Sequence, residues 1–109
     1  MLSVAPLLPM TYRANKDGFE SLKRAFEKSM AAAEESQDVL LVVCGTQDFF
    51  VREIKYVEPD ILEFSGFVAS GQSSTFIVAD GKPFTVWIEL FALSGTPRRE
   101  THFVDTTRL

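Results

Sequence analysis

The chain has 109 residues, of which 46% are hydrophobic and 24% are charged, and its formal net charge is −4. This length and composition predict one globular domain, residues 1–109, that is large enough to bury a core without disulfides or metal ions. The acidic balance argues against a general nucleic-acid-binding surface, which would be basic.

Residues 1–16 are predicted to form an extended arm, because Pro6 and Pro9 favour extended neighbours and cannot donate to a strand ladder. The arm could still lie along a sheet as an edge segment. Its apolar start has no basic region, which is atypical of a signal peptide, and no stretch of the chain approaches about 18 apolar residues. The single cysteine, Cys44, fits a reducing compartment. We therefore expect a cytoplasmic protein that does not enter the membrane.

Residues 17–36 are predicted to form an amphipathic helix. Asp17 is placed as its N-cap, with Glu20 at the spacing of a capping box. Apolar residues then recur at steps of three and four, which makes one stripe along the helix; they are Phe19, Leu22, Phe26, Met30 and Ala33. The stripe predicts a helix that packs against a sheet and ends near Ser36.

Residues 38–93 are predicted to form five antiparallel strands. The strands are expected at 39–44, 49–57, 61–68, 74–79 and 84–93, with polar turns between them. The first is apolar throughout, which predicts burial on both faces. In the second, the apolar side switches across Arg52 and Glu53, which indicates either a β-bulge or a strand with one apolar end on each face. Gly66 indicates a further bend or bulge in the third strand.

Residues 94–109 are expected to form a tail, with a possible short strand around 101–105. The predicted fold class is therefore α+β: an N-terminal amphipathic helix followed by a five-stranded antiparallel meander. The sequence leaves open whether this meander is a strongly bent sheet or a small closed barrel.

The order of one helix and five bent strands over residues 17–92 resembles the small SH3-like barrel of Sm-like proteins. The phrase REIKYVEPDILEFSG resembles the strand–turn–strand of their first motif, with Tyr56, Asp60 and Leu62 filling the pattern. The resemblance implies ring-shaped oligomers that bind RNA. The connection ADGKP stands where the second motif would lie, and Arg52 or Glu53 stands where the first motif carries glycine, so no binding residue is carried over.

Chemical motifs are sparse. His102 is the sole histidine and cannot build a Cys/His metal site, and Cys44 lies in the most apolar strand, where a thiol is usually inert. The carboxylates Glu58, Asp60 and Glu63 could serve a hydrolase or hold a cation loosely, but they also fit a solvated turn. Arg98 and Arg99 form a small basic spot in the tail. We predict no catalytic residue, no cofactor and no metal, and an enzyme is the least expected class.

Aromatic residues carry the functional expectation, because the aromatics of the predicted strands cannot all point inward if the strands alternate. The helix and the N-terminal arm could cover the second face of the sheet, or this face could be a subunit interface. Aromatic side chains are enriched in subunit interfaces. The first hypothesis is a non-enzymatic module that self-associates through strand edges and exposed aromatics; any other protein partner is unknown. The alternative is a small-ligand or RNA-binding barrel that uses Tyr56, Trp87 and Arg52 at its mouth. Residues proposed to contact a partner or ligand are Arg52, Tyr56, Phe67, Phe76 and Trp87.

Overall fold

The computed structural model describes residues 9–44, 49–93 and 100–108. In chain order the elements are β1 Met10–Arg13, α1 Lys16–Ala32, β2 Gln37–Val43, β3 Phe49–Val57, β4 Ile61–Val68, β5 Ser73–Ala79, β6 Pro83–Ala92, β7 His102–Asp105 and a short 3-10 helix, η1, Thr106–Arg108. Residues 1–8 of the predicted arm, the turn at 45–48 and the basic spot at Arg98 and Arg99 lie outside the described residues.

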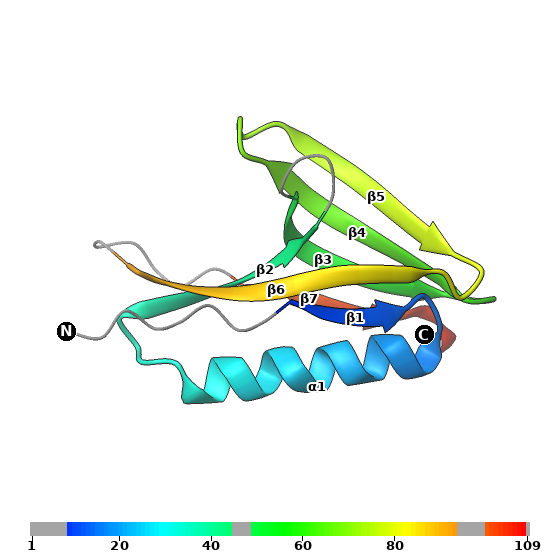
Figure 1. Cartoon of the computed structure of the whole chain (residues 1–109), viewed down its shortest axis with the longest axis horizontal. Coiled ribbons are helices and arrows are strands. Elements are labelled where there is room, and N and C mark those ends of the chain that lie inside the picture. The colour runs from blue at the N-terminus through cyan, green and yellow to red at the C-terminus, as the bar shows by residue number, and fades with distance from the viewer. Residues whose placement is uncertain (1–8, 45–48, 94–99, 109) are drawn as a thin grey trace.

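Seven strands form one bent sheet, and α1 packs on one side of it (Figure 1). The strand order is β1-β6-β2-β3-β4-β5, and β7 pairs with β3 away from this path. Neighbouring strands are antiparallel except for β3 and β7, which run parallel. The predicted α+β class is confirmed, with one helix and a mostly antiparallel sheet. The expected five-stranded meander is wrong, because β1 and β7 add two strands and β6 returns to pair with β2 instead of β5.

The sheet is strongly bent but does not close into a barrel. Along the described residues β5 pairs with β4 alone, and β1 with β6 alone. A closed barrel would require the two end strands to pair with each other. Of the two predicted alternatives, the structure thus has the bent sheet, and the expectation of a small closed barrel is wrong.

The helix begins at Lys16, one residue earlier than predicted, and its N-cap is Asn15 and not Asp17. Asn15 has extended backbone angles, and its side-chain oxygen accepts a hydrogen bond from the Gly18 N–H at 2.7 Å. The chain turns tightly after β1, where the Asn15 N–H donates to the Arg13 carbonyl at 2.9 Å. This turn fixes the helix start, and Asp17 falls within the first turn, where its charge suits the helix dipole.

The helix ends at Ala32 rather than near Ser36. Ala33 already has extended backbone angles. A compact turn follows, in which Gln37 N–H donates to the Glu34 carbonyl at 2.9 Å and the Gln37 side chain accepts from the Glu34 N–H at 3.0 Å. Helix propensity alone does not reveal this turn, because the glutamates that form it are good helix formers.

Replacing Asn15 by alanine is expected to lower the free energy of unfolding by about 1 kcal/mol, because the cap bond to Gly18 is lost. Urea unfolding followed by Trp87 fluorescence measures the change. Asp17→Ala is the matched control and should have a smaller effect. If Asp17→Ala were the more damaging of the two, the cap assignment would be wrong.

A β-bulge in β3 places its two apolar halves on one face. The register against β4 shifts between Val51 and Glu53. Val51 and Ile54 on either side of the shift are both fully buried in one core. The bulge predicted from the parity switch at Arg52 and Glu53 is confirmed, and Gly66, opposite Val51, marks the bend in β4.

The bulge also divides one edge of β3 between two neighbours. β2 pairs with the first part, Phe49–Val51, whereas β7 pairs with the second, from Glu53 to Tyr56. The Phe103 ring of β7 lies 5.9 Å from Phe19 of the helix. The short strand predicted around 101–105 is thus present. It connects the helix to the part of β3 that does not pair with β2.

The core lies between α1 and the concave side of the sheet. Phe19, Leu22 and Phe26 of the helix stripe are buried against it. Residues 38–43 of β2 are buried without a break, so both faces of this strand are covered, as its composition predicts.

Candidate interaction edge

The bent sheet leaves a groove where a barrel would close. Its volume is about 770 Å³, and it lies between β5 and the start of β6, two strands that diverge from their connecting turn (Figure 1). The turn uses Asp80 and Gly81 in left-handed conformations, with φ of 59° and 68°. The groove is lined by Cys44, Phe76, Ile77, Val78, Ala79, Asp80, Lys82, Pro83, Phe84 and Thr85.

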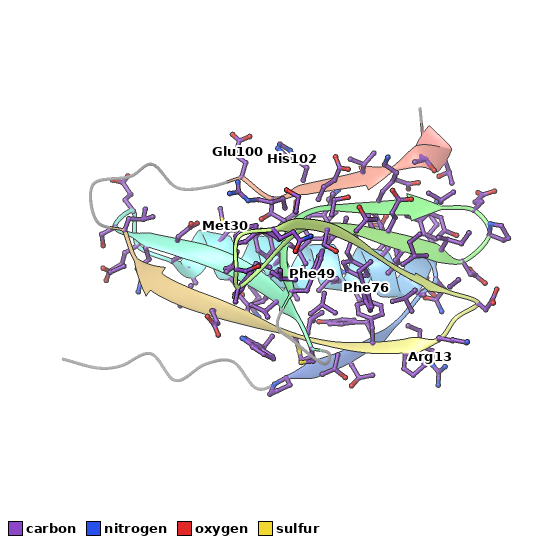
Figure 2. All side chains as sticks on the ribbon, turned by 90° about the horizontal axis from the view of Figure 1, so that it is seen from above. Arg13, Met30, Phe49, Phe76, Glu100 and His102 are labelled. Atoms are coloured by element: carbon purple, nitrogen blue, oxygen red, sulfur yellow. The ribbon has the colours of Figure 1, made fainter. Side chains whose placement is uncertain are left out.

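Phe76 shows that the core is open along this groove. Its ring packs on two core rings, 6.1 Å from Phe49 and 5.9 Å from Phe64 between centroids. In Figure 2 the labelled Phe49 and Phe76 lie close together. Phe49 and Phe64 are buried, whereas Phe76 is 38% exposed. A further strand beside β5 would cover the exposed part of this ring.

The backbone of β5 presents free hydrogen-bonding groups toward the groove side. Val68 N–H donates to the Gln72 carbonyl, and Asp80 N–H to the Asp60 carbonyl, both at 3.0 Å. Gln72 and Asp80 stand at the two ends of the β4–β5 pairing, and both have even numbers. Backbone N–H and C=O groups alternate in direction along an antiparallel strand, so those of the even-numbered β5 residues point toward β4. The backbone groups of the odd-numbered residues then point away from β4, and Thr75 and Ile77 are the central residues of this kind. No strand pairs with them in the described part of the chain.

The side chains of β5 do not protect this edge. Ser73–Ala79 contains neither a charged residue nor a proline, the two devices that most often block strand addition. Ile77 is 58% exposed on the convex face. An uncharged edge with exposed apolar residues is suited to pairing with another strand.

The opposite end of the sheet is protected. β1 covers the outer edge of β6, with Tyr12 opposite Phe84. Pro9 precedes β1, and Arg13 ends it. The Arg13 side chain donates to the Gly81 carbonyl at 3.1 Å and places a cation at the β1 edge. The two ends of the sheet therefore differ in chemistry.

Four of the five predicted contact residues lie at or near the surface, but they form two groups. Phe76 faces the groove. Phe67 and Trp87 are half-buried on the convex face, where Phe67 stacks on Phe50 at 5.4 Å and the Arg52 guanidinium lies 5.3 Å from the Phe67 ring centre.

Tyr56 lies away from both groups. It is 4% exposed and packs on Phe19 in the core. The structure therefore does not bring Tyr56, Trp87 and Arg52 together at a barrel mouth. Trp87 also uses its indole N–H internally, in a 2.8 Å hydrogen bond to Glu89.

The residues considered for catalysis are not assembled into a site. His102 is exposed on β7, 3.4 Å from the exposed Glu100 (Figure 2). Cys44 is half-buried in the groove wall. Asp60 is a turn residue with φ of 49°. Within residues 9–44, 49–93 and 100–108, no three His, Cys, Asp or Glu side chains are grouped as a metal would require.

The sequence predicts unpaired strand edges in general but does not indicate which edge lies next to an open part of the core. The signal available was the absence of charge in residues 73–79, in contrast to Pro9 before residues 10–13 and Arg13 at their end. That contrast becomes meaningful only when residues 10–13 are known to pair with β6, 70 or more positions away in the chain.

Comparison of the chain with models of protein families, with curated proteins and with solved structures gives no match. In the described part of the chain, no helix is long and apolar enough to span a bilayer.

Proposed function

We propose that the protein is a non-enzymatic interaction module that self-associates through a strand edge. The observation that carries the proposal is β5, an unpaired and uncharged strand that borders an open part of the core. Pairing there satisfies the outward backbone groups of Thr75 and Ile77 and covers the exposed Phe76 ring. Both gains come from one contact, which favours association over a free edge.

RNA or nucleotide binding has less support from the same surfaces. Stacking sites for bases combine exposed aromatic rings with a positively charged groove. Here the Arg52 guanidinium already lies over the Phe67 ring, and the Trp87 indole N–H donates a hydrogen bond to Glu89. Lys55 lies opposite Glu63 on the neighbouring strand, so its positive charge is offset there.

Native mass spectrometry of gently purified protein, over a range up to high micromolar concentration, tests the proposal. We expect an oligomer that dissociates on dilution. The variant Thr75→Pro should shift it to monomer, because Thr75 N–H points away from β4 and its loss removes one edge donor without breaking the sheet.

Thr11→Pro is the matched control. Thr11 is an exposed threonine on the β1 edge, at an odd position that faces away from β6, since Ala14 at an even position donates to Lys82. It should leave the oligomer unchanged. A wild-type protein that stays monomeric at high micromolar concentration would refute the proposed function.

A further inference from the structure

We infer that the partner of β5 is β5 of a second copy, paired antiparallel about a two-fold axis that passes beside Phe76. The inference rests on the proposed function and specifies its partner strand, symmetry and register. It follows from three features: the inequality of the two sheet edges, the parity of the free backbone groups, and the position of Phe76 in its strand.

The inequality of the two end strands disfavours a ring built by strand pairing. A ring needs a heterologous contact, in which one edge of a chain pairs with a different edge of the next. The second edge would have to be that of β1, the other end of the strand path, but Pro9 precedes this strand and the charged Arg13 ends it, two features that disfavour strand addition. Pairing of the uncharged β5 edge with its own copy is therefore favoured, and such an isologous contact closes after two copies.

The parity of the free groups sets which residues face each other. In an antiparallel pair, the two residues that exchange hydrogen bonds must both direct their N–H and C=O groups toward the partner. On β5 these are odd-numbered positions. Odd residues must therefore lie opposite odd residues, and Thr75 opposite Ile77 of the second copy satisfies this condition.

The register with the greatest overlap of the two strands also places Thr75 opposite Ile77 of the second copy. Ser73–Ala79 has seven residues, and its centre is Phe76. Full antiparallel overlap places each Phe76 opposite its own copy, in a pair that is not hydrogen-bonded, where side chains approach most closely. Both rings then lie on the core side, over the groove that leaves each of them 38% exposed.

The chemistry of the edge is compatible with its own copy. A strand that pairs with itself brings like residues together, so any charge near the centre would repel its counterpart. The strand has none. On the convex face, Ile77 of each copy gains an apolar neighbour in the Thr75 methyl group of the other.

Disulfide trapping between two labelled chains tests the inference. In a Cys44→Ser background, Thr75→Cys and Ile77→Cys are made in separate chains that differ in mass by isotope labelling. Both positions are exposed, so we expect circular dichroism like that of the parent. Residues in a hydrogen-bonded antiparallel pair are about 5.5 Å apart between Cα atoms, within the range that a disulfide spans.

Mixing the two chains under mild oxidation should give the mixed 75–77 dimer, at a yield many times that of either chain oxidised alone. Thr11→Cys mixed with Thr75→Cys is the control for the β1 edge and should give no more than random collision does.

Each other outcome overturns the inference, and the outcomes separate it from the proposed function. An oligomer in native spectra that gives equal 75–75 and 75–77 trapping would retain self-association but reject this register. An oligomer trapped through Thr11→Cys would move the contact to β1. A monomer with no trapping would reject both the inference and the proposed function.

Discussion

Replacing Gly66 by alanine is expected to lower the free energy of unfolding by about 3 kcal/mol or more, beyond the usual effect of overpacking. A Cβ atom at this position would lie 1.9 Å from the Phe50 carbonyl oxygen. The obstacle is backbone in the neighbouring strand at the bulge of β3, so no side-chain rotation relieves it. Urea denaturation of the two proteins measures the loss.

Ser65→Ala is the control for Gly66, because it changes the adjacent residue of the same strand without adding volume. It should alter the unfolding free energy by less than about 1 kcal/mol. A Gly66→Ala protein that unfolds within the same margin of the wild type would contradict the close approach of β3 and β4 at the bulge.

Truncation of Phe19 to alanine is expected to destabilise the fold by about 3–5 kcal/mol. Phe19 is 1% exposed, and its ring lies 5.9 Å from both Tyr56 and Phe103. It therefore joins the helix to β3 and β7 in one cluster. Thermal and urea unfolding at low micromolar concentration, where association is weak, give the change.

The same truncation at Phe76 is the matched comparison. Because Phe76 is 38% exposed, its loss should lower the stability of the monomer much less than the loss of Phe19. It should instead weaken association. If Phe76→Ala destabilised the monomer as much as Phe19→Ala, the Phe76 ring would belong to the closed core. The core would then not be open along the groove beside β5.

Local patterns in the sequence were sufficient for most of the secondary structure. The stripe from Phe19 to Phe26 predicts the buried face of the helix, and it is buried as expected. The parity switch at Arg52 indicates the bulge, because two apolar pairs of opposite parity can share one core only if a residue is inserted between them. Such signals lie within a few residues and depend on side-chain period alone.

Contacts between distant segments could not be read in the same way. Residues 10–13 pair with β6, and β7 runs parallel to β3 some 50 positions earlier. Neither segment has more than four residues in its strand, which is too short for a reliable alternation. Their positions follow from what the longer strands leave unpaired, which is a property of the assembled sheet.

The candidate edge shows the same division. Strand alternation predicts that Phe76 points away from the main core face, and it borders the groove. Tyr56 is predicted as a stacking group at a barrel mouth but is buried, because the bulge turns Ile54 and Tyr56 inward with Val51. Of the two interpretations of the parity switch, the bulge places Tyr56 on the same face as Val51, in the core.

Amide hydrogen exchange of the wild-type protein, followed residue by residue by NMR at low and high protein concentration, tests the central claim most directly. Amides of β5 that face β4, such as Phe76 and Val78, should be protected at both concentrations. Those of Thr75 and Ile77 should exchange quickly in dilute protein and become protected as concentration rises. Rapid exchange of Thr75 and Ile77 at every concentration, or a rise in protection at Thr11 and Arg13 instead, would contradict association through the open edge of β5.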